Sequence, residues 1–279
     1  MDKKTQHTVS CTNCGTPMHG IYCSQCGQKK FSKHELTITH FLQEAIHAFT
    51  HFDSKVFKAI FYLFAKPGFL TKEFSLGRVQ KHIKPLTLFL LLNAFFFFLG
   101  HRIFSIKDAD YTYFIEKYPA KQKIFATFKE SHNLSEIEVA QKFNVKKEFY
   151  QKLIYFIMIP LFGVGLNLIF FNRRKLFIEN LVHAIHTFSW YILMLIVVVP
   201  LVLVISEVLN ISHQQFEKLL IYIILCIAFI YNYLSIKRIF SFKPVLTFIY
   251  AIPVTLLLII LDIYFEGWLI FKLTTLHFI

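Results

Sequence analysis

Residues 181–208 read LVHAIHTFSWYILMLIVVVPLVLVISEV, a run in which apolar side chains occupy most positions. A helix needs about 20 such residues to cross the hydrocarbon core of a membrane, so this run is long enough to span it. Apolar residues make up 55% of the chain, and 34 of its 279 residues are Phe. We therefore predict an all-α polytopic membrane helix bundle with about five spans, near residues 83–100, 153–171, 181–208, 219–234 and 245–265.

Basic residues are distributed asymmetrically around these spans. Residues 1–84 contain twelve Lys and Arg against five acidic residues, and the short loops 172–180 and 236–243 are also basic. Because Lys and Arg accumulate in cytoplasmic loops, we expect the N-terminus and both loops in the cytoplasm. Five spans then place the C-terminus and a loop at 101–150 outside. The net charge of +13 fits anionic lipid headgroups, so we expect the lipid bilayer as a partner and not nucleic acid.

Four cysteines precede the apolar runs, in the stretch CTNCGTPMHGIYCSQCG at residues 11–27. Each C-x-x-C-G knuckle directs two sulfur atoms toward one point, so the four together fit a structural zinc ribbon: Cys11, Cys14, Cys23 and Cys26. Residues 1–30 contain too few apolar side chains to fold without the metal. Thiolates also indicate a reducing compartment, in agreement with a cytoplasmic N-terminus. The alternative is a disulfide framework, which this spacing disfavours.

Residues 31–82 have the apolar periodicity of amphipathic helices that lie in the membrane interface. The polar face of the first such helix carries three histidines, His40, His47 and His51. This face fits either a solvated surface or a pH-sensing or metal-binding stripe. Three cations precede the span at 83–100, namely Arg78, Lys81 and Lys84. We expect them to contact lipid phosphates.

Ionisable residues inside a span are costly, so each is a candidate functional residue. Glu179, His183 and His186 lie at helical spacing at the start of the span at 181–208. Such a face could bind a metal or relay protons, and the alternative is hydrogen bonding between helices. Asp262, near the outer end of the last span, is expected to reach water. Cys226 is expected to be a buried small apolar residue.

Several of these stretches follow one another in a particular order. They are Cys11–Gly27, Lys66–Gly68, Gly77-Arg78 before Pro85, Glu179–His186, and Tyr231–Leu234 before Lys237-Arg238. In this order they resemble the DUF3667 family of bacterial membrane proteins. The resemblance implies a zinc ribbon, a helical domain in the bacterial inner (plasma) membrane, and no catalytic activity. In topology alone, the chain is also similar to Yip-type membrane proteins.

The sequence contains no P-loop, nucleophile elbow or H-E-x-x-H motif, so we do not expect an enzyme. We expect a non-enzymatic integral membrane protein whose cytoplasmic zinc ribbon mediates interaction with, or assembly of, a protein partner. The alternative is a transporter or channel for small solutes or ions, with Glu179, His183 and His186 at the cytoplasmic end of the third span. A metal-dependent membrane enzyme is the least supported hypothesis, because one helix offers too few ligands.

Overall fold

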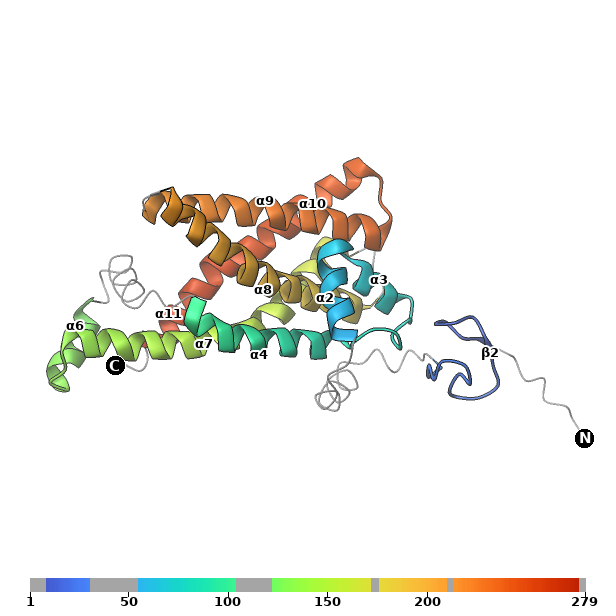
Figure 1. The fold of residues 1–279 in the computed structure, drawn as a ribbon, viewed down its shortest axis with the longest axis horizontal. Helices are drawn as coiled ribbons and strands as arrows, with labels where there is room; N and C mark the ends of the chain where they lie inside the picture. Colours follow the sequence, from blue (N-terminus) through green and yellow to red (C-terminus); the bar gives the residue numbers. More distant parts are fainter. Residues whose placement is uncertain (1–8, 31–54, 104–121, 172–175, 210–212, 276–279) are drawn as a thin grey trace, which may run out of the picture.

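The computed structural model describes residues 9–30, 55–103, 122–171, 176–209 and 213–275, which are mostly helical (Figure 1). Two short strands, β1 (Val9–Ser10) and β2 (Pro17–Met18), belong to the cysteine-rich head. The helices are α2 (Lys55–Ala65), α3 (Phe69–Ser75), α4 (Pro85–Ile103), α6 (Gln122–Ser131), α7 (Glu136–Ile169), α8 (Phe177–Val208), α9 (His213–Phe240), α10 (Pro244–Ile259) and α11 (Gly267–Thr275). A π-helical segment, η4 (Ile260–Glu266), joins α10 to α11.

Helix α8 forms the centre of the helical part, because the side chains from Val182 to Met194 are all buried. Helices α4 and α7 pack along it, and α2, α3 and α9 also contact it. Aromatic rings fill these interfaces. Phe162 of α7 meets Phe188 edge to face at 5.7 Å, and Trp190 stacks on Tyr231 of α9 at 3.9 Å. A helix that is apolar on all sides is expected to be enclosed in this way.

In the described part of the chain, three helical stretches are long and apolar enough to cross a membrane: Phe177–Val202, Leu219–Phe240 and Pro244–Asp262. They coincide with the last three predicted spans. The first two predicted spans coincide with shorter apolar stretches of α4 and α7, Pro85–Phe96 and Leu153–Ile169. The helical, membrane-like character of the chain is therefore confirmed, whereas the count of about five spans stays a prediction.

Helix α7 begins at Glu136, inside the segment 101–150 that we expected to be a loop. Ser135 caps it: the Glu138 backbone N–H donates to Ser135 Oγ at 3.3 Å, and the Ser135 backbone N–H donates to Glu138 Oε2 at 2.7 Å. This reciprocal pair is a capping box. Helix α6 folds back on α7, and Phe125 meets Phe143 at 5.6 Å. This small amphipathic hairpin contains charged residues, so a search for long apolar runs does not detect it.

The outer faces of α9 and α10 expose apolar side chains, as helices that face lipid do. Cys226 lies on such a face of α9 and is exposed, so the prediction that it is buried is wrong. A continuous apolar run does not reveal which side of a span faces the protein. Asp262 is half-buried and accepts a hydrogen bond of 2.6 Å from the Tyr191 hydroxyl of α8. The carboxylate is therefore tied to the central helix.

Candidate functional site

The head is built from two copies of one backbone turn. In the first knuckle the Gly15 N–H donates to Cys11 O at 2.8 Å, and in the second the Gly27 N–H donates to Cys23 O at 2.9 Å. Both glycines have left-handed φ values, 79° and 70°. Glycine adopts this conformation without steric cost, which explains its place after each second cysteine. Strands β1 and β2 pair antiparallel beside the first knuckle.

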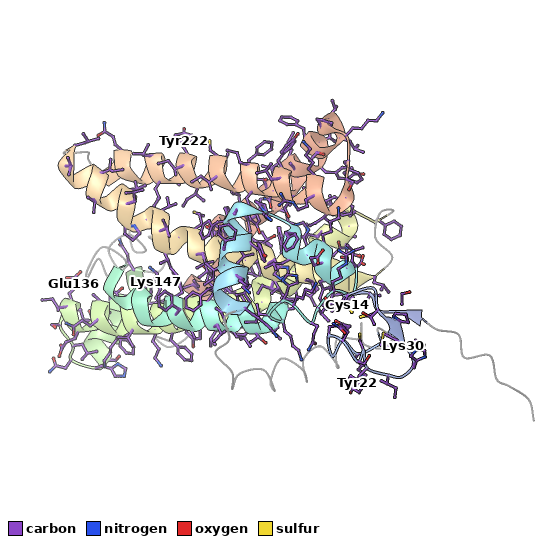
Figure 2. All side chains as sticks on the ribbon, turned by 45° about the vertical axis from the view of Figure 1, so that its right-hand side comes forward. Cys14, Tyr22, Lys30, Glu136, Lys147 and Tyr222 are labelled. Carbon is purple, nitrogen blue, oxygen red and sulfur yellow. The ribbon has the colours of Figure 1, made fainter. Side chains whose placement is uncertain are left out.

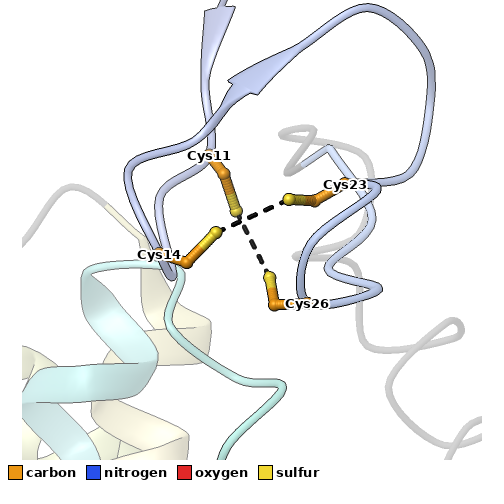
Figure 3. A group of neighbouring side chains, drawn as sticks. All are labelled: Cys11, Cys14, Cys23 and Cys26. Atoms are coloured by element: carbon orange, nitrogen blue, oxygen red, sulfur yellow. Dashed lines mark hydrogen bonds between the residues drawn. The ribbon is translucent and has the colours of Figure 1, made fainter.

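The four cysteine sulfurs converge on one point (Figure 3). Cys11 Sγ lies 3.6 Å from Cys26 Sγ, and Cys14 Sγ lies 3.5 Å from Cys23 Sγ. All four sulfurs are within 4.8 Å of one another, and none is disulfide-bonded. A tetrahedral ion with Zn–S bonds of about 2.3 Å needs sulfurs about 3.8 Å apart. The predicted cysteines therefore form a site that could bind a metal ion, and this geometry does not support the disulfide alternative.

Thr16 favours the thiolate form of Cys14. Its hydroxyl lies 3.3 Å from Cys14 Sγ. Hydrogen bonds from the Thr16 hydroxyl and backbone lower the pKa of Cys14 to about 6. Because a metal binds thiolate rather than thiol, this shift favours metal binding by Cys14. The pKa of Cys23 is instead raised to about 11, with burial and the neighbouring Cys14 and Cys11 thiols as the raising causes.

The head contacts the loop between α3 and α4, residues 76–84. From the first knuckle, the Thr12 hydroxyl donates to Gly77 O at 3.3 Å. Beside the second knuckle, Gln28 Oε1 accepts the Gln80 N–H at 3.2 Å. Gln28 is only 3% exposed, although it belongs to a head with little core of its own. Both halves of the metal site are therefore connected to the same loop.

The turn Pro67-Gly68, which precedes α3, lies directly against α9. A Cβ atom on Gly68 would lie 2.6 Å from Ser235 O, and Gly68 has a left-handed φ of 75°. Only glycine fits so close a backbone approach in this conformation. Arg238 Nη1 also donates to Pro67 O. Helix α3 and the loop that follows it are thereby fastened to α9.

The predicted polar residues of α8 lie at the same junction. His186 Nδ1 is 2.9 Å from Thr71 Oγ1 of α3, and His183 Nε2 is 3.1 Å from Ser235 Oγ of α9. Both histidines are buried, and Glu179 is half-buried. Among the described residues, only the cysteines form a group of three or more potential ligands close enough to share a metal ion. The geometry thus favours hydrogen bonding between helices over a second metal site.

The cations predicted to contact lipid phosphates lie in or beside the loop 76–84. Arg78 Nη1 pairs with Glu73 Oε1 at 3.1 Å, while Lys81 is exposed and Lys84 is half-buried. His82 Nε2 lies 3.7 Å from Glu73 Oε2. Burial lowers the pKa of His82, and the Glu73 carboxylate opposes this shift. Lipid contact stays a prediction, for which Arg78 and Lys81 both have exposed side chains.

Four residues of this junction did not emerge from the sequence as site residues: Gln28, Gly68, Thr71 and Ser235. Gly68 had a visible signal, because a Pro-Gly pair marks the end of a helix. The roles of Thr71 and Ser235 depend on contacts with distant segments and leave no local pattern. The predicted histidine stripe, His40, His47 and His51, lies outside the described residues.

Comparison with protein families supports part of the family resemblance that was inferred from the sequence. Residues 53–97 match the family described as protein of unknown function (DUF3667). The resemblance inferred from the sequence is thus confirmed over this stretch, which contains α2, α3, the loop 76–84 and the start of α4. The cysteines and the histidines of α8 lie outside it. No curated protein matches the chain, and no solved structure matches it.

Proposed function

We propose that this chain is a non-enzymatic integral membrane protein whose zinc-stabilised head is a docking module for a protein partner. One observation carries the proposal: hydrogen bonds connect the head to the loop 76–84, and α3 connects that loop to α8 and α9. A head attached in this way has a defined position on the helices. Such a position suits a module that orients a partner relative to the membrane.

The head also presents an apolar surface. Ile21 and Tyr22 are 65% and 63% exposed, and Figure 2 shows Tyr22 at the outer edge of the head. The Tyr22–Lys29 bridge and a hydrogen bond from Lys30 N–H to Ile21 O fix the backbone at this edge. Tyrosine is among the residues enriched at protein contact surfaces. We infer that Ile21 and Tyr22 form the contact surface for the partner.

The proposed location is the bacterial inner membrane, with the head in the cytoplasm and the C-terminus outside. Cysteines that bind metal as thiolates need a reducing compartment, which supports this orientation. The head and the basic connection between α9 and α10 also lie at the same end of the helices (Figure 1). That arrangement agrees with the positive-inside rule.

The transporter alternative has less support. A transport site near the inner end of α8 would need polar groups that face a path for solute. His183 and His186 instead bond to hydroxyls of α9 and α3 within packed helix contacts. Their geometry serves the attachment of α3, so the docking module remains the function that we propose.

The test is cross-linking in native membranes followed by purification of the tagged protein. The Cys23→Ser variant should lose metal and partner yet stay in the membrane. The double variant Ile21→Ser, Tyr22→Ser should keep its metal and lose the partner, whereas Ser24→Ala on the same knuckle should behave as wild type. Recovery of the same partner at wild-type yield with Cys23→Ser would refute a metal-dependent docking role.

A further inference from the structure

A groove of about 500 Å³ runs between the C-terminal half of α9 and the first turns of α10. Its size lies in the range of ligand pockets, about 300–1,000 Å³. The side chains that line it are apolar or aromatic: Phe229, Ile230, Tyr233, Leu234, Pro244, Val245, Phe248 and Ile249. The rings of Phe229 and Phe248 meet edge to face at 5.4 Å and hold the two helices at this separation.

The groove opens on the outer face of the two helices. Ile230, Val245 and Phe248 are all exposed, and both helices are among the stretches able to cross a membrane. In a bilayer this face meets acyl chains rather than water. An apolar groove in this position suits a flexible hydrocarbon chain better than a polar solute.

Two lysines flank one end of the groove. Lys237 follows Leu234 by one turn on the same face of α9, and Lys243 directly precedes Pro244. Both lysines are exposed, while the neighbouring Arg238 donates to Pro67 O. Residues 229–249 include no Asp or Glu. One end of the groove is therefore positively charged, and the side chains that line the rest of it are apolar.

We propose that this groove binds an anionic phospholipid, with an acyl chain between α9 and α10 and the phosphate held by Lys237 and Lys243. The distribution of charge matches such a molecule, which carries its negative group at one end of its hydrocarbon. A zwitterionic lipid offers the same chains but no net charge, so it binds more weakly. The site lies at the end of α9 that also holds Pro67 and Gly68, so the bound lipid borders the attachment of α3.

The test compares two lipids with identical chains, dioleoyl phosphatidylglycerol and dioleoyl phosphatidylcholine, added to the full chain in detergent. Native mass spectrometry counts the lipids retained, and thermal unfolding reports their effect on stability. We expect phosphatidylglycerol to be retained and to raise the unfolding temperature more than phosphatidylcholine. The double variant Lys237→Gln, Lys243→Gln should bind phosphatidylglycerol about thirtyfold more weakly, since each juxtamembrane cation contributes a factor of about five to six and the two factors multiply.

Two further variants distinguish lipid binding in the groove from a general electrostatic attraction of anionic lipid to the protein. Leu234→Trp fills the groove and should reduce the binding of both lipids. Lys123→Gln with Lys129→Gln removes the same charge from exposed sites on α6, far from the groove (Figure 1), and should leave binding unchanged. Equal binding of both lipids by wild type, or an equal loss in the α6 control, would overturn the proposal. Conversion of a dimer to a monomer by Leu234→Trp, without loss of lipid, would assign the groove to a second copy of the chain instead.

Discussion

Replacing Gly68 with alanine should loosen the contact between α3 and α9. The new Cβ would lie 2.6 Å from Ser235 O and 2.8 Å from Ser235 Cα, distances that backbone atoms cannot tolerate. One of the two helices must then move. The left-handed conformation of residue 68 costs about 1–2 kcal/mol for a residue with a side chain, and overpacking adds about 1–3 kcal/mol. We expect a total destabilisation of about 2–5 kcal/mol.

The assay is thermal unfolding in one detergent, together with hydrogen exchange of the amides in α3. Gly15→Ala is the matched control, because Gly15 has a similar φ of 79° and a methyl group there would meet no other atom within 4 Å. That variant carries the backbone strain without the steric clash. Gly68→Ala should therefore unfold at a lower temperature than Gly15→Ala and exchange faster in α3. Equal unfolding temperatures of the two variants, with unchanged exchange in α3, would refute the close-contact argument.

Three other predictions follow from the site. Removal of metal by a chelator should expose residues 9–30 to protease while the helical circular dichroism of the bundle persists, and Cys23→Ser should show the same pattern without chelator. Burial lowers the pKa of His82 in the folded protein. As the pH falls, His82 is therefore protonated in the unfolded state before it is protonated in the folded state. The stability that His82 contributes should be complete above about pH 6.5 and decline as the pH falls below it. His82→Gln should flatten this part of a plot of unfolding temperature against pH. Thr71→Val removes the hydroxyl bonded to the buried His186 ring and should cost about 1–3 kcal/mol in unfolding experiments, whereas Thr71→Ser should preserve most of the stability.

The sequence predicted those features that depend on short spacings or on composition. Two C-x-x-C-G knuckles specify where four sulfurs lie, so the metal site could be predicted directly. Long apolar runs likewise located α8, α9 and α10. The start of α7 was also predictable in principle, because Ser135 and Glu138 have the spacing of a capping box. The first turns of α7 contain charged residues, so a prediction based on hydropathy alone did not identify them as helical.

Contacts between distant segments could not be predicted in the same way. His186 was recognised as unusual, but its partner Thr71 lies 115 residues away. Nothing local to Gln28 indicates that it accepts a hydrogen bond from Gln80, 52 residues further on. Such pairs depend on how helices pack, and one sequence does not specify that packing. The junction of head, loop and helices therefore emerged only from the structure.

The most direct test of the proposed attachment is the hydrogen-exchange rate of the Gln80 backbone amide, with and without metal. This N–H donates to Gln28 Oε1, which is positioned by the second cysteine knuckle. We predict slow exchange in the metal-loaded protein, and fast exchange both after chelation and in the metal-loaded Gln28→Ala variant. The same exchange rate at Gln80 in all three samples would show that the head does not rest on the loop 76–84, and the proposed connection from the metal site to α8 and α9 would fail.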